Sequence, residues 1–288
     1  MKMKLSIIAA AMVFAGQANA AITTGAGFGD QLFLSVWDLT AQTSYTRGLG
    51  LTMNQMISGA GINFGSNLNG SGFSASGDTN SYTLAADSNL SSFLHAASVA
   101  GDAVSWNVVS GDTNGGSAYG ANGYMTTSRG VIPTAINDSA INNIGVSGQY
   151  IGGVNALMPN ANYGNLDSIS TTSATGALGY VFAQSNGFGN NFGGQFTWTN
   201  DALVGNSLNF NLFTPATGSR GYNGNSVIYQ FANANGASTW TLGTNGTLSY
   251  ATASVAAVPE PSEIGLMVSG FGLVGFLANK RRKALKGK

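Results

Sequence analysis

The stretch STWTLGTNGTLSYA, residues 238–251, contains two short runs in which large apolar residues alternate with polar ones. Successive side chains of a strand point to opposite faces of a sheet, so apolar partners must be in register to share one face. A three-residue loop that ends at Gly246 pairs Leu242 with Leu248 and Trp240 with Tyr250, whereas a two-residue loop separates these pairs. The longer loop needs a left-handed residue at its third position, which Gly246 supplies. The stretch therefore predicts a β-hairpin with a glycine bulge.

The same alternation recurs along the chain, for example in Leu208, Phe210 and Leu212 against the asparagines between them. Runs of this kind, rich in β-branched and aromatic residues and bounded by Gly, Asn, Ser and Asp, are typical of strands with one buried and one wet face. Nine such runs are present, at residues 31–37, 81–85, 103–109, 179–183, 195–199, 207–213, 226–231, 238–243 and 247–251.

One segment has a different pattern. Between residues 134 and 158 the apolar positions, among them Ile136, Ala140, Ile141 and Ile144, have helical spacing, and glycines interrupt the second half. We therefore expect an all-β fold, a single large β-sandwich or jelly-roll-like domain over residues 21–256, with one short helical insertion.

The charges are few and unevenly placed. Only 8% of the residues are charged, and the formal net charge is zero. Residues 21–257, however, contain three Arg, no Lys, nine Asp and no Glu, a formal charge of −6. Nucleic-acid binding requires clustered cations that displace phosphate counterions, so this acidic region excludes that class of partner.

Residues 1–20 have the three parts of a secretory signal peptide. Lys2 and Lys4 precede an apolar run, and Ala18 and Ala20 provide the small residues of a cleavage site. The run is too short to span a bilayer. The sequence therefore predicts export through the Sec translocon and cleavage after Ala20.

The C-terminal residues 257–288 contain Pro259, Glu260 and Pro261, an apolar run over residues 264–278, and a cluster of Lys and Arg. Fifteen apolar residues form a helix of about 22 Å, and basic side chains that snorkel at its end extend its reach. We expect a transmembrane helix here, followed by a cytoplasmic stop-transfer tail that begins Lys280, Arg281, Arg282, Lys283.

This order of Pro-Glu-Pro, short glycine-rich apolar helix and basic tail resembles the PEP-CTERM sorting domain. The resemblance covers about a tenth of the chain. It implies that a membrane-embedded exosortase recognises the Pro-Glu-Pro motif and cuts nearby. It also implies that the chain is anchored through residues 264–278 before processing. Afterwards the body reaches the outer surface or the exterior, often among the exopolysaccharide and biofilm components of Gram-negative bacteria.

Residues suited to catalysis or metal binding are few. With no Cys and one histidine, His95, the chain lacks the ligands of a conventional zinc site, and a serine triad would depend on that histidine. Asp78 and Asp112, each in the repeated pentapeptide SGDTN, are candidates for calcium ligands, although Asp in such turns also bonds to its own backbone. No other cofactor is expected.

These observations favour a non-enzymatic protein of the cell surface or extracellular matrix. One alternative is a carbohydrate-binding module of the same fold, which would contact exopolysaccharide through tyrosines in glycine-rich loops. The candidates are Tyr119, Tyr124, Tyr163 and Tyr222. Another is a polysaccharide hydrolase that uses a pair of Asp carboxylates, although no pair has a recognisable spacing.

Overall fold

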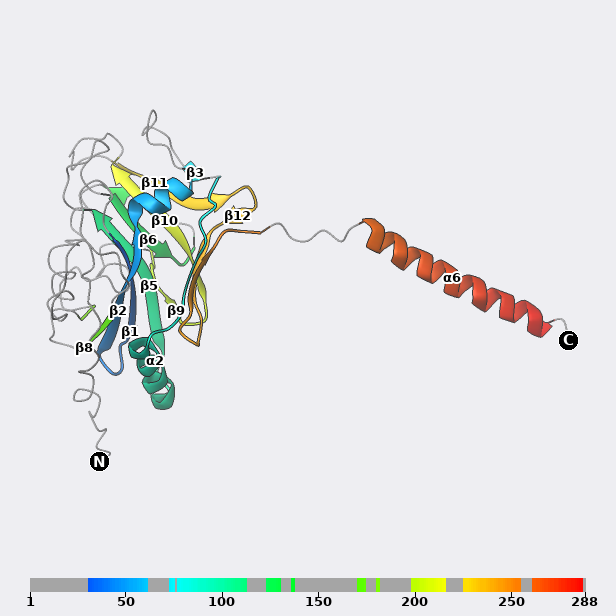
Figure 1. Cartoon of the computed structure of the whole chain (residues 1–288), viewed down its shortest axis with the longest axis horizontal. Coiled ribbons are helices and arrows are strands. Elements are labelled where there is room, and N and C mark those ends of the chain that lie inside the picture. Colours follow the sequence, from blue (N-terminus) through cyan, green and yellow to red (C-terminus); the bar gives the residue numbers. More distant parts are fainter. Residues whose placement is uncertain are drawn as a thin grey trace. The chain divides into compact units, whose positions relative to one another are not determined.

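The structure, a computed structural model, describes residues 31–61, 73–75, 77–112, 123–130, 136–137, 170–174, 180–181, 198–215, 225–254 and 261–286 (Figure 1). The chain divides into two compact units, residues 1–253 and 254–288, which are considered separately. The first unit contains two helices and fourteen strands in its described part, and the second contains one helix, α6 (Pro261–Lys286).

The strands of the first unit join into one curled sheet in the order β4-β14-β13-β10-β6-β5-β1-β2-β8. Strand β11 pairs with β10 beyond the segment that contacts β13, and it also pairs with β3, β7 and β12. The β11–β3 pair is parallel and the other ladders are antiparallel. The bounds are β1 (Gln31–Asp38), β2 (Thr43–Thr52), β3 (Phe73–Ala75), β4 (Tyr82–Leu84), β5 (Val104–Asp112), β6 (Gly123–Ser128), β7 (Ile136–Asn137), β8 (Ser170–Ala174), β9 (Ala202–Leu203), β10 (Ser207–Pro215), β11 (Asn225–Asn233), β12 (Gly236–Ala237), β13 (Thr239–Leu242) and β14 (Leu248–Ala251).

The sheet curls far enough that β4, at one end of the strand order, approaches β2 near the other end. The hydroxyl of Tyr82 donates to the carbonyl of Leu49 at 2.5 Å. The Nη1 of Arg47 donates to the carbonyl of Ala85 at 2.8 Å. Side-chain bonds, which we call the closing contacts, therefore link two strands that share no backbone ladder in the described sheet.

The predicted hairpin is confirmed in register. Trp240 pairs with Tyr250, and Leu242 pairs with Leu248. The amide of Gly246 donates to the carbonyl of Gly243 at 2.8 Å, and Gly246 has φ +79, the left-handed conformation that the three-residue loop requires. The local sequence thus determines this hairpin.

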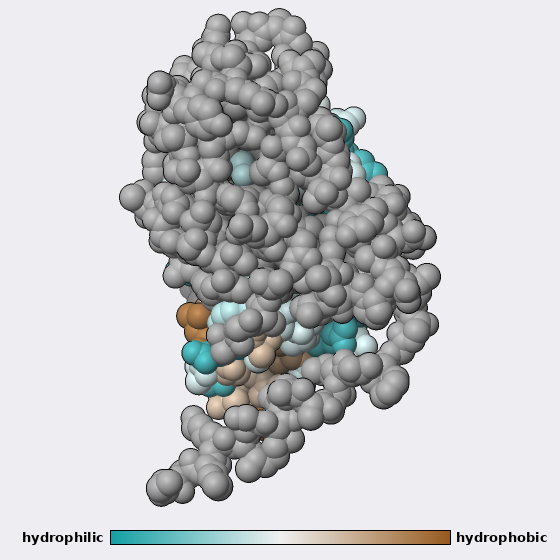
Figure 2. Space-filling model, turned by 90° about the vertical axis from the view of Figure 1, so that its left-hand side faces the viewer, coloured by the Kyte–Doolittle hydropathy of each residue, from teal (hydrophilic) through white to brown (hydrophobic). Residues whose placement is uncertain are grey.

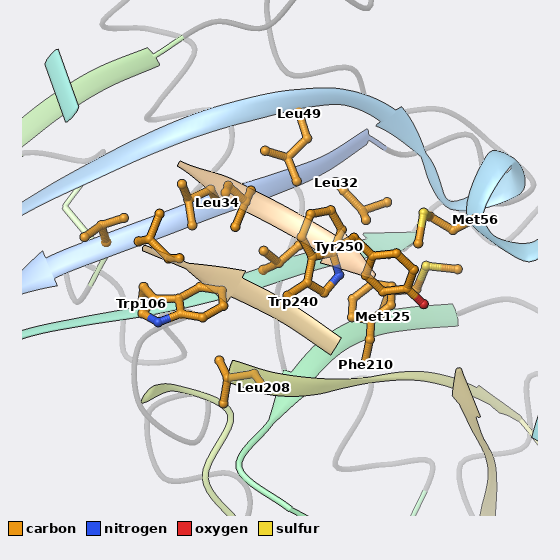
Figure 3. Close-up of a cluster of buried hydrophobic side chains, with 14 of the residues drawn as sticks. Leu32, Leu34, Leu49, Met56, Trp106, Met125, Leu208, Phe210, Trp240 and Tyr250 are labelled. Carbon is orange, nitrogen blue, oxygen red and sulfur yellow. The ribbon is translucent and has the colours of Figure 1, made fainter. Parts of the chain in front are cut away.

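The main hydrophobic core lies on one face of the curled sheet, where strands from both ends of the strand order contribute side chains (Figure 3). Leu208, Phe210 and Leu212 are at most 1% exposed, as their alternation predicts. The ring of Phe210 meets that of Trp240 edge-on at 5.9 Å, and Trp240 packs against Tyr250 at 4.9 Å. Aromatic side chains of β10, β13 and β14 therefore form the centre of the core.

The second face of the sheet is also buried over its central strands, so the prediction of one wet face is wrong there. Phe33 and Ser35 of β1, Asn107 of β5 and Asn211 of β10 are 0–2% exposed. Alternation separates two faces of a strand, but polar side chains on the second face do not by themselves show that the face contacts water.

Two helices of the body were not predicted. Helix α1 (Met53–Gly59) begins with a capping box between Thr52 and Gln55. Helix α2 (Ser88–Ala100) is capped by Asp87, whose carboxylate accepts from the amide of Leu90, and it ends at the left-handed Gly101. Both helices bury apolar side chains in the main core.

The body is mostly β, as predicted, but two helices pack on it and its finer form differs from the prediction. The described strands belong to one continuous sheet rather than to the two separate sheets of a sandwich. The expected helix at 134–158 is wrong at residues 136–137, which form β7, and its other residues lie outside those described. Seven of the nine expected runs contain strands. The described parts of 179–183 and 195–199 contain bends or irregular backbone.

Candidate functional site

Helix α6 begins at Pro261, the third residue of the Pro-Glu-Pro motif, and proline suits the first turn of a helix because it has no amide hydrogen to leave unpaired. Seven large apolar side chains of α6 are 52–70% exposed: Met267, Val268, Phe271, Leu273, Val274, Phe276 and Leu277. At 100° per residue these positions surround the helix rather than forming one stripe. The large apolar side chains are therefore not confined to one face of the helix, as they are in an amphipathic surface helix.

The body has far fewer exposed residues of this kind. In the part that the structure describes, Leu39, Val99 and Leu203 are its exposed large hydrophobic side chains. Figure 2, which shows one face of the molecule, has hydrophobic residues beside hydrophilic ones at its lower end. Scattered exposed apolar residues are normal for a protein surface, so these three side chains need no special explanation.

The basic residues follow the apolar run within the same helix. Lys280 and Arg281 are exposed, and Arg282 and Lys283 continue α6. Cations in the last turns of a helix interact favourably with the partial negative charge of its C-terminus. The segment therefore combines an exposed apolar surface with a cationic end.

The expectation of a transmembrane helix is not supported. Within the described residues, no helix combines the length and the apolar character needed to cross a membrane. The apolar run of α6 contains four glycines and Ser269, and Asn279 and Lys280 follow it directly.

Four residues of the predicted processing sites lie outside the described residues: Ala18 and Ala20 of the signal cleavage site, and Pro259 and Glu260 of the sorting motif. The expectations for these positions stay predictions.

Asp78, one of the two calcium candidates, is a buried hydrogen-bond acceptor that is 2% exposed. Its Oδ1 accepts from the amide and the Nδ2 of Asn80 at 2.9 and 2.8 Å, and its Oδ2 accepts from the hydroxyl of Tyr250. Burial, together with the charge of Asp78, raises the pKa of Tyr250 well above its usual range. Both carboxylate oxygens thus bond to protein donors that join the segment before β4 to β14.

The other calcium candidate, Asp112, ends β5 opposite Gly123 of β6, whereas Asp78 bonds to β14. The structure therefore does not bring the two candidates together on one strand pair. Among the described residues, no three His, Asp or Glu side chains are grouped closely enough to hold a metal ion.

The aromatic candidates for sugar binding are also changed by the structure. Tyr124 is 1% exposed within β6, so it cannot stack on a sugar ring, and the prediction of a loop position for it is wrong. Tyr119, Tyr163 and Tyr222 lie outside the described residues. His95 is exposed on α2, as expected of a surface histidine.

An acidic group that sequence reasoning missed is Asp87, which joins α2 to β2. Besides capping α2, its Oδ2 accepts from the hydroxyl of Tyr45 at 3.0 Å and lies 3.6 Å from the Nε of Arg47. The side chains of Arg47 and Asp87 are 12% and 27% exposed. The signal that could have found Asp87 is an Asp fourteen residues before a glycine, with Leu90, Phe93 and Ala97 at helical spacing between them.

A second missed pair is Arg129 and Asp201. The Nε of Arg129 donates to the backbone carbonyl of Asp201 at 3.0 Å, and its Nη2 lies 3.8 Å from Oδ2. The carboxylate is 7% exposed, and its burial raises the pKa of Asp201, although the Ser105 hydroxyl and the Arg129 guanidinium act in the opposite direction. The pair attaches the segment before β9 to the end of β6.

Comparison with family models, with curated proteins and with solved structures finds no match to this chain.

Proposed function

We propose that this chain is an exported, non-enzymatic protein of the cell surface or extracellular matrix, whose C-terminal segment is a sorting signal of the PEP-CTERM kind. In this proposal the signal peptide directs export through the Sec translocon. The segment 257–288 then holds the chain at the membrane until an exosortase cuts near Pro259-Glu260-Pro261 and the body, residues 21–256, moves to the exterior.

The observation that carries the proposal is the surface of α6. Its large apolar side chains lie on all sides of the helix, and exposed Lys280 and Arg281 follow them. An apolar helix of this kind is stable where lipid or a membrane protein covers it, and a cationic end favours an anionic membrane surface. In this proposal the sorting signal is covered by lipid or by a membrane protein only until it is removed, after which the body no longer carries an apolar helix.

The acidic groups of the body support a structural role. Asp38 accepts at Oδ1 from the amides of Thr40 and Ala41, which fixes the turn between β1 and β2. Asp78, Asp87 and Asp201 join separate segments of the sheet, as described above. In this proposal the body uses these carboxylates to hold its own fold and contacts matrix polymer, exopolysaccharide included, through its polar surface.

The test compares two substitutions that each replace a carboxylate with an amide. Glu260→Gln lies in the motif, and Glu263→Gln lies three residues later. The full chain is produced in a Gram-negative host with an exosortase and in the same host with that gene deleted. We expect a shortened, exported protein, without the basic tail, from the wild type and from Glu263→Gln. We expect an unprocessed, membrane-associated chain from Glu260→Gln and from the deletion host.

Mass spectrometry of both termini identifies the processed bonds, and cell fractionation locates the product. Recovery of the intact chain in the cytosol, basic tail included, contradicts the proposal. Equal processing in the two hosts contradicts the role of the exosortase.

A further inference from the structure

The folded body ends just beyond its last strand. Strand β14 ends at Ala251, yet the chain remains fixed for two more residues. The carbonyl of Ala253 accepts from the Nδ2 of Asn233 at 2.7 Å and from the Nδ2 of Asn235 at 3.3 Å. Two amide side chains thus bind the one backbone oxygen with which the first unit ends.

These asparagines are themselves held by the hairpin that joins β11 and β12. Asn233 pairs with Gly236, and the Oδ1 of Asn233 accepts from the amide of Asn235 at 2.8 Å. A Cβ atom at Gly236 would lie 3.4 Å from the Cβ of Ala253, so the chain passes directly against the hairpin. The two donors are therefore positioned before they bind Ala253.

We propose that Asn233 and Asn235 form a terminal clamp that fixes the end of the body at Ala253, so that proteolysis of the linker to the sorting motif stops before it reaches β14. Proteases cut backbone that is exposed and free of hydrogen bonds, and strand ends without tertiary bonds fray readily. The clamp removes that freedom from residues 252–253, the only residues between β14 and the linker.

The protected strand is central to the core. Leu248 and Tyr250 are each 1% exposed, and β14 lies between β13 and β4 in the sheet. Tyr250 also donates to buried Asp78. Removal of residues from the end of β14 would expose this part of the core, so a fixed boundary is useful to a protein that is cut nearby and then remains outside the cell. This use rests on the proposed function, whereas the clamp itself does not.

The experiment is limited digestion of the full chain by proteinase K, with the new C-termini identified by mass spectrometry. We expect the wild-type body to end at Ala253 or beyond. In Asn233→Ala/Asn235→Ala we expect cleavage between Ala251 and Ala253 to accelerate about tenfold, as expected for the loss of two hydrogen bonds of ordinary strength. Asn206→Ala is the matched control, because Asn206 also donates to a carbonyl at 3.3 Å, that of Leu203, away from Ala253.

Asn235→Asp keeps the hairpin bond of Asn233 but replaces the second donor with a carboxylate, so this variant tests the clamp if the double variant fails to fold. It is expected to accelerate the same cleavage, with unchanged tryptophan fluorescence. The same end points and rates in wild type and Asn235→Asp would overturn the proposal. Because no sorting enzyme takes part, this result and that of the export test are independent.

Discussion

Gly246→Ala tests the hairpin at the centre of the fold. Gly246 has φ +79, a conformation that costs an alanine about 1–2 kcal/mol. A Cβ atom there would lie 2.8 Å from the Cβ of Ala86 and 3.3 Å from the Cδ1 of Leu94 on α2. Overpacking of this kind costs about 1–3 kcal/mol. Alanine also restricts the unfolded chain, which offsets about 0.4–1 kcal/mol. We therefore expect the free energy of unfolding to fall by about 1–5 kcal/mol.

The assay is equilibrium urea unfolding of the full chain, followed by tryptophan fluorescence. All four tryptophans lie before residue 254, so the signal reports on the body. Gly101→Ala is the matched control, because Gly101 has φ +74 and a Cβ there would meet nothing within 4 Å. In Gly101→Ala the free energy of unfolding should fall only by the cost of placing alanine in the left-handed conformation. If Gly246→Ala destabilises the protein no more than Gly101→Ala, the packing argument is refuted.

Three further changes test the buried polar groups. Tyr250→Phe leaves Asp78 without its hydroxyl donor and should lower the free energy of unfolding by about 1–3 kcal/mol in urea titrations. The pKa of Tyr250 is raised in the folded chain, so its contribution to stability is fully present below about pH 10. That contribution is lost as pH rises further, because the unfolded chain releases this proton first. Tyr250→Phe should therefore reduce the alkaline loss of stability. The pKa of Asp201 is raised, so its stabilisation is fully present below about pH 4 and is lost as pH rises through the folded value; Asp201→Asn should remove that loss in unfolding curves measured from pH 4 to 7. Asp87→Ala removes the cap of α2 and the acceptor of Tyr45, and thermal unfolding should show a loss of about 2–4 kcal/mol.

The sequence predicted those parts of the fold that depend on residues close together in the chain. The pairing of Trp240 with Tyr250 follows from alternation and from one glycine, both within fourteen residues. The strand order does not follow in this way, because β10 also pairs with β6, which lies far earlier in the chain, and with β13, from which β11 separates it in sequence. Strand β6 was not predicted, because Tyr124 was assigned to a glycine-rich loop, whereas the structure buries Tyr124 and the Thr and Ser residues that follow Met125.

The residues of the candidate site also differ in whether their roles depend on local sequence or on contacts between distant segments. Pro261 and the basic residues from Lys280 form one continuous segment, so their order was readable, and α6 has the helical form that was expected. The roles of Asp78 and Tyr124 depend on packing between distant strands, which no local pattern encodes. The clamp at Ala253 was missed for the same reason, since Asn233 and Asn235 resemble ordinary turn residues in the sequence.

The closing contacts mark the line, here called the seam, along which β4 and β2 meet without a described backbone ladder. Elsewhere neighbouring strands are joined by repeated backbone bonds, but along this line the described bonds come from side chains: Tyr82 and Arg47 each donate to a carbonyl, and Asp87 contacts β2. Under load or on warming, the molecule should part here first, because few bonds must break together. Helix α2 follows β4 directly in the chain, so opening the seam would carry Leu90 and Phe93 out of the core, while the backbone ladders on either side stay whole.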